Sequence, residues 1–104
     1  MDNPKSIAAS TLECVSDDSR EFEMQLSLGS PEFDPDVGCF RCAVVLRSPG
    51  RIKTMHSCGD DTLQAVSLSF IIANILVTDE LSSRNARCIS HHEYDTHLNS
   101  EPSS

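Results

Sequence analysis

The chain has 104 residues, 38% of them apolar, with no tryptophan and a formal net charge of −8. This length predicts a single domain with one modest core. The negative charge disfavours nucleic-acid binding and would suit a basic protein partner.

The sequence predicts a cytoplasmic protein that makes no membrane contact. No apolar run reaches the roughly 20 residues that are needed to cross a bilayer, and the first residues lack the apolar core of a signal peptide. Five cysteines is an odd number, which in a chain without an export signal argues for reduced thiols.

Two strands are expected before residue 30. Residues 7–15 predict a first strand, and the Ser- and Asp-rich residues 16–19 predict a turn. Apolar and polar residues alternate over 21–28, which is the period of a half-buried strand. Its expected inner face consists of Phe22, Met24, Leu26 and Leu28. Residues 29–38 carry two Pro, two Gly and three acids, so we expect a loop there.

A third strand is expected over 40–47. Its expected inner face consists of Phe40, Cys42, Val44 and Leu46. If the inner faces of the second and third strands are aligned with Phe40 opposite Leu28, then Glu21 lies opposite Arg47 on the solvent side. The loop of about ten residues between these strands does not determine their register, so we expect the faces to do so.

A fourth strand is expected over 52–58, after a turn at Pro49 and Gly50. A two-residue turn would direct Lys53 inward, opposite Leu46. Burying an unpaired lysine costs several kcal/mol, so we expect a longer turn or a bulge instead. The inner face would then consist of Ile52, Thr54, His56 and Cys58.

A helix of about 18 residues is expected after Gly59. Asp61 is its expected N-cap, and Gln64 stands three residues later, where its amide can reach back to the backbone N–H of the cap. Apolar residues follow at helical spacing in two adjoining stripes. The stripes are Leu63, Val66, Phe70, Ala73 and Val77, and Ala65, Leu68, Ile72 and Leu76. Because Ile71 and Ile75 lie beyond the first stripe, we expect the helix to pack on the sheet and on a second surface.

The chain resembles a group of small uncharacterised bacterial proteins that are catalogued as a domain of unknown function. The residues that carry the resemblance are Phe40-x-Cys42 and Gly59-x-Asp61-x-x-Gln64-Ala65, followed by an apolar helix. The resemblance covers roughly residues 7–80. It implies a sheet-plus-helix domain and no activity, cofactor or catalytic residue.

Cysteine and histidine residues provide two candidate zinc sites. Cys39-x-x-Cys42 and Cys88-x-x-His91 would together supply four ligands, although residues three apart in a strand point to opposite faces. If residues 84–96 were helical, one face would carry a ligand set that suits zinc. That set is Cys88, His91, His92 and Asp95. Scattered histidines on a polar tail are the alternative explanation.

The expected fold is α+β, an antiparallel four-stranded meander packed against one long helix. Residues 1–81 would form the domain, and 82–104 a polar tail, partly disordered or folded as a short docked helix. We expect a non-catalytic protein-binding or assembly module and a homodimer, with an acidic inhibitor of a basic protein as one version. The alternative is a small metal- or thiol-dependent enzyme, for which His56 and Cys58 are the thiolate candidates.

Overall fold

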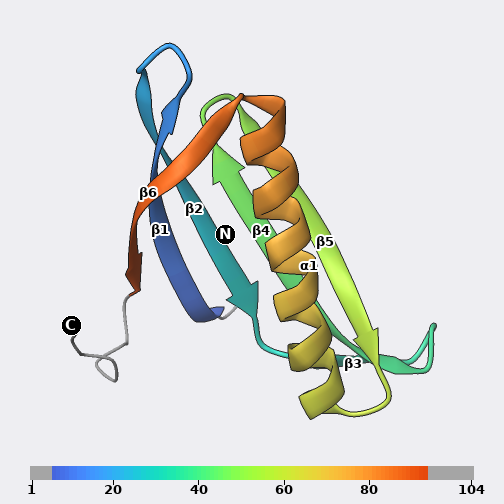
Figure 1. The fold of residues 1–104 in the computed structure, drawn as a ribbon. Coiled ribbons are helices and arrows are strands. Elements are labelled where there is room, and N and C mark those ends of the chain that lie inside the picture. Colours follow the sequence, from blue (N-terminus) through green and yellow to red (C-terminus); the bar gives the residue numbers. More distant parts are fainter. Residues whose placement is uncertain (1–5, 94–104) are drawn as a thin grey trace.

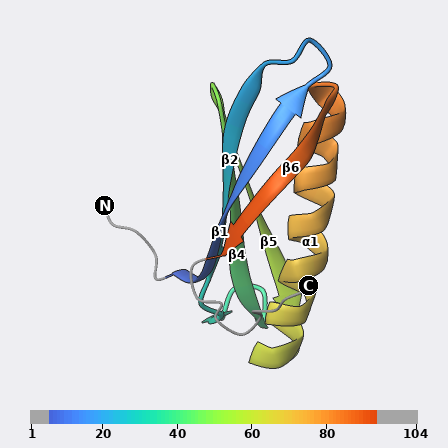
Figure 2. The same ribbon diagram turned by 60° about the vertical axis from the view of Figure 1, so that its left-hand side comes forward.

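The computed structural model describes residues 6–93, which form one antiparallel sheet and one helix (Figure 1). The strands are β1 (Ser6–Ser16), β2 (Glu21–Gly29), β3 (Glu32–Asp34), β4 (Cys39–Ser48), β5 (Arg51–Gly59) and β6 (Ala86–Glu93), and the helix is α1 (Thr62–Ser83). The helix covers one face of the sheet, so the molecule has two layers (Figure 2). The predicted α+β class and the single long helix are confirmed.

The four predicted strands are neighbours in chain order, as in a meander: β1 pairs with β2, β2 with β4, and β4 with β5. The sheet has six strands rather than four, because β3 and β6 join it. Alternation in β2 places Met24 and Leu28 in the core, and alternation in β4 places Val44 and Leu46 there. The predicted inner faces of these two strands are therefore correct.

The predicted register between β2 and β4 is wrong. Leu28 lies opposite Val44 rather than Phe40, and Gln25 rather than Glu21 lies opposite Arg47. The cause is β3, which forms inside the predicted loop and pairs with Cys39–Arg41. Because β3 occupies the start of β4, β2 pairs further along β4 while its faces remain the same.

The predicted inner face of β5 is also wrong. The turn at Pro49 and Gly50 has two residues, and Gly50 adopts a φ of 76°. Ser48 therefore pairs with Arg51, and Lys53 lies opposite the buried Leu46. The Lys53 side chain can point toward the helix because it is paired with carboxylates of α1. The free-energy cost of burying an unpaired lysine therefore does not apply.

Helix α1 begins at the predicted cap. Asp61 Oδ1 accepts a hydrogen bond of 2.8 Å from the N–H of Gln64. The return bond differs from the prediction, since Gln64 Oε1 accepts from the N–H of Asp60, at 2.6 Å, and not from that of Asp61. Gly59 lies against this first turn, where an added Cβ would lie 2.5 Å from the backbone nitrogen of Ala65.

Residues 86–93 form β6, which pairs with β1 on the side away from β2. The helix on which the second zinc set depended, and the short docked helix expected as one form of the tail, are therefore absent from residues 86–93. The turn from α1 to β6 is fixed by Asn85, whose φ is 51° and whose carbonyl accepts from the N–H of Asp17. Part of the predicted tail thus belongs to the sheet, and residues 94–104 lie outside the described residues.

Candidate functional site

Helix α1 leaves large apolar side chains in water. The exposed fractions are 75% for Leu63, 55% for Phe70, 58% for Ile71 and 57% for Ile75. The residues that the helix buries are instead small or polar for the most part. They are Ala65, Ser69, Ala73, Leu76 and Glu80. Of the predicted stripe that contains Leu63 and Phe70, only Ala73 is buried, and Ile71 and Ile75 lie outside the side that packs on the sheet, as expected.

The helix lies along the β4–β5 hairpin from end to end. Near its start, the Ser57 hydroxyl of β5 donates a hydrogen bond of 2.7 Å to the carbonyl of Ala65. Near its end, Glu80 bonds to Ser48 of β4 and pairs with Lys53 of β5. The helix-facing sides of β1 and β2 consequently lie beside the helix rather than beneath it.

An apolar groove of about 480 Å³ follows from this placement. Its principal apolar walls are Leu12, Leu26 and Leu28 from the sheet and Phe70, Ala73 and Val77 from the helix. Phe70 thus stands at the rim of a concave apolar surface. Ile71 and Ile75 do not line this groove.

Glu80 is the buried centre of an ion cluster at the end of α1. Its side chain is fully buried, and Oε2 accepts hydrogen bonds of 2.7 Å from both Arg84 Nε and the Ser48 hydroxyl. Arg51 Nε lies 3.6 Å from the same oxygen. Oε1 lies 3.1 Å from Lys53 Nζ, an ion-pair contact that lacks the angles of a good hydrogen bond.

The cluster keeps the Glu80 carboxylate charged. Burial by itself raises the pKa of this carboxyl, but the hydrogen bonds from its donors, Arg84 first, outweigh burial and lower the pKa from 4.5 to about 2. The neighbouring Glu80 carboxylate in turn raises the pKa of the Lys53 ammonium. The Glu80 carboxylate is therefore fully ionised at neutral pH, and the cluster is typical of a structural ion pair.

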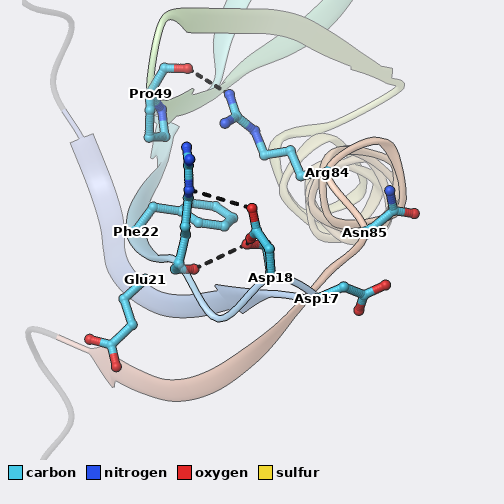
Figure 3. Close-up of a pocket in the computed structure, with 9 residues that line it drawn as sticks. Asp17, Asp18, Glu21, Phe22, Pro49, Arg84 and Asn85 are labelled. Atoms are coloured by element: carbon cyan, nitrogen blue, oxygen red, sulfur yellow. Dashed lines mark hydrogen bonds and ion pairs between the residues drawn. The ribbon is translucent and has the colours of Figure 1, made fainter.

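A second cavity, of about 660 Å³, lies where three turns meet at this end of the sheet (Figure 3). Arg84 crosses it, with its guanidinium 5.3 Å from the centre of the Phe22 ring and Nη2 donating to the carbonyl of Pro49 at 2.6 Å. Asp18 accepts a hydrogen bond from the Ser16 hydroxyl, which lowers the pKa of its carboxyl. The residues that line the cavity include no cysteine and no histidine, so they offer neither a thiol nucleophile nor an imidazole base.

The structure separates the predicted cysteine sets. Cys39 forms a disulfide with Cys58, so two of the five thiols expected to be reduced are joined. Cys42 is buried, and its thiol donates to the carbonyl of Gly29. The C-x-x-C pair therefore does not form half of a zinc site, and Cys58 does not form a thiolate beside His56.

Of the three cysteines outside the disulfide, Cys14 and Cys42 are buried and Cys88 is exposed. Burial, and next the neighbouring Cys88, raises the pKa of the Cys14 thiol to about 11, which leaves it protonated at neutral pH. Among the side chains that the structure describes, those of residues 6–89, no three His, Cys, Asp or Glu come close enough to hold a metal ion. The zinc set Cys88, His91, His92 and Asp95 loses the helix on which it depended, and Asp95 lies outside the described residues.

The length and apolar composition of α1 would by themselves allow it to cross a membrane, contrary to the expectation that no segment is long enough. The core helix of a soluble protein passes the same test. Sheet contacts bury 22% of its most apolar stretch. This low fraction agrees with the exposed side chains described above and does not distinguish a membrane from a protein partner.

Comparison with known proteins assigns no family. No family model, no curated protein and no solved structure matches the chain. The resemblance carried by Gly59-x-Asp61-x-x-Gln64-Ala65 stays a prediction, and function has to be inferred from the geometry of the surfaces.

Proposed function

We propose that the protein is a non-catalytic assembly module that forms a homodimer through the apolar surface of α1. The observation that carries the proposal is the exposure of Leu63, Phe70, Ile71 and Ile75 on one helix. These side chains extend across the exposed half of the helix, and exposed apolar surface of this extent commonly marks an interface. A two-fold dimer is the commonest arrangement that covers such a surface.

The free energy gained by covering this surface is comparable to the cost of association. Removing a fully exposed Leu, Ile or Phe side chain from water contributes about 1.5–3 kcal/mol. Since these four side chains are 55–75% exposed, each would contribute about 1–2 kcal/mol on burial. Three or four of them would offset an association cost in the lower part of the estimated range of about 4–15 kcal/mol.

The sheet contacts of α1 favour a protein surface over a lipid bilayer as the cover. A helix that entered a bilayer would have to leave the β4–β5 hairpin and separate Glu80 from Lys53 and Ser48. Leaving one charge of a buried pair without its partner costs about 3–5 kcal/mol. A second protein molecule can cover the exposed side of α1 without disturbing these contacts.

Sedimentation equilibrium at micromolar concentration tests the proposal. We expect the wild-type chain to sediment at twice its 11.4 kDa monomer mass, and the double variant Phe70→Ser, Ile75→Ser to sediment as a monomer. Val37→Ser is a matched control, because Val37 is as exposed as Ile75 but lies in the turn between β3 and β4. A monomeric wild type, or a double variant that dimerises as strongly as the control, would contradict the proposal.

A further inference from the structure

Strand β5 is an open edge of the sheet. It pairs with β4 in an unbroken register from Arg51 to Gly59, and no strand in the described part of the chain pairs with its other side. Edge strands of monomeric proteins are commonly protected by proline, by a bulge or by an inward charge. Strand β5 has neither of the first two, and the inward charge of Lys53 is already paired with Asp79 and Glu80.

We infer that β5 pairs antiparallel with β5 of a second copy about a two-fold axis at Met55, so that the two sheets become continuous. This inference rests on the proposed dimer and specifies which side of α1 is covered. In a two-residue hairpin the flanking residues, here Ser48 and Arg51, form a hydrogen-bonded pair, and hydrogen-bonded pairs then alternate along the strands. The backbone groups of Ile52, Thr54, His56 and Cys58 therefore point to the open edge.

Met55 is the central residue of β5, so an axis at this position pairs all nine residues of the strand. It sets Arg51 opposite Gly59 of the second copy and Lys53 opposite Ser57 of the second copy. Neither basic residue then faces a like charge, which would oppose pairing. Met55 lies opposite itself and is 46% exposed in the single chain.

The same axis brings the two helices to packing distance. Each α1 lies along its own β4–β5 hairpin, as its bonds from Ala65 to Ser57 and from Glu80 to Ser48 show. With strands about 4.8 Å apart, the midlines of the two hairpins in a continuous sheet lie about 10 Å apart. Packed helices have axes about 8–10 Å apart, so the two helices would touch side by side and antiparallel.

The sides of α1 that would touch are apolar except for Asp79 near the end of the helix. Residues 68, 72, 75 and 79 recur at helical spacing on one side of the helix, and Asp79 shows that this side faces β5, because its carboxylate lies 3.3 Å from Lys53 Nζ. This stripe contains Ile75, and Ile71 lies next to it. Phe70 lies on the other side of the helix, at the groove beside β1 and β2.

Two variants of matched exposure on opposite sides of α1 test the inference. We expect Ile75→Glu to weaken dimerisation at least tenfold in sedimentation equilibrium, and Phe70→Glu to change it less than threefold. Met55→Lys would place two ammonium groups at the axis, so it should also weaken the dimer at least tenfold. Circular dichroism melts at a concentration where each variant is monomeric verify that it is folded.

A cross-link reports the axis directly. Adjacent residues of a pair that is not hydrogen-bonded have Cα atoms about 4.5 Å apart, which is within disulfide range. In a Cys88→Ser background, Met55→Cys should form a covalent dimer with oxidised glutathione at least ten times faster than Phe70→Cys does. A wild-type monomer would refute both the dimer and this inference. A wild-type dimer that is disrupted by Phe70→Glu but not by Ile75→Glu, or that cross-links equally at both positions, would refute the β5 axis alone.

Discussion

Replacing Glu80 with glutamine would remove the one negative charge at the centre of the ion cluster while retaining the shape of the side chain. Glu80 is fully buried, and it lies between Arg84 and Lys53. A pKa lowered from 4.5 to about 2 favours the folded, ionised state by about 3 kcal/mol. This value agrees with the cost of about 3–5 kcal/mol for removing one partner of a buried pair. We therefore expect Glu80→Gln to lower the free energy of unfolding by about 3–5 kcal/mol at pH 7.

Urea unfolding followed by circular dichroism measures this cost, and pH supplies an independent check. Because the pKa of Glu80 is lower in the folded state, its contribution is complete above about pH 5 and is lost as the pH falls toward about 2. The difference between wild type and Glu80→Gln should therefore be constant from pH 7 to 5 and shrink below pH 5. Asp79→Asn is the control, since Asp79 pairs with the same lysine but is 71% exposed. We expect that variant to lose at most about 1 kcal/mol. Equal losses for both variants, or a difference that does not depend on pH, would refute the reasoning.

Two further variants concern the start of α1. Asp61→Ala should cost about 1 kcal/mol of stability, measured by urea unfolding, because the first turn loses its cap; a variant that unfolds like wild type yet no longer self-associates would show that Asp61 belongs to a binding site. Gly59→Ala should cost about 1–3 kcal/mol in the same assay, since its Cβ would overlap the backbone of Ala65. An unchanged unfolding curve for this variant would mean that the first turn of the helix can move away from β5.

The strand faces were predictable because alternation is a local property. Met24 and Leu28 in β2, and Val44 and Leu46 in β4, occupy the core as their spacing indicates. The register between these strands was not predictable from the same spacing. A slip by four residues preserves the faces, and only the pairing of β3 with Cys39–Arg41 selects between the two registers.

The inner face of β5 shows that the free-energy cost of burying a lysine does not by itself predict which face of a strand is buried. An inward lysine is unfavourable when it is unpaired, but Lys53 and Glu80 are 27 positions apart in the sequence and meet only when α1 folds back over the hairpin. The disulfide between Cys39 and Cys58 joins neighbouring strands of one hairpin, and it forms on the register that the two-residue turn sets. In the sequence, the available indication of the ion cluster was the acidic pair Asp79 and Glu80 near the end of a mostly apolar helix, together with Arg84 four residues after Glu80.

The ion cluster also explains why apolar side chains of α1 remain in water. Glu80 has to face the hairpin to reach Lys53 and Ser48, and this requirement sets the rotation of the helix about its axis. A rotation large enough to turn Phe70 toward the sheet would turn Glu80 away from Lys53 and Ser48 and expose Leu76, which is buried now. The cost of about 3–5 kcal/mol for the separated charge would offset the gain of about 1.5–3 kcal/mol for each apolar side chain that became covered. The contact of Glu80 with the hairpin and the exposed apolar surface of α1 are therefore consequences of one helix orientation. A partner on the β5 side can cover Ile75 without changing that orientation.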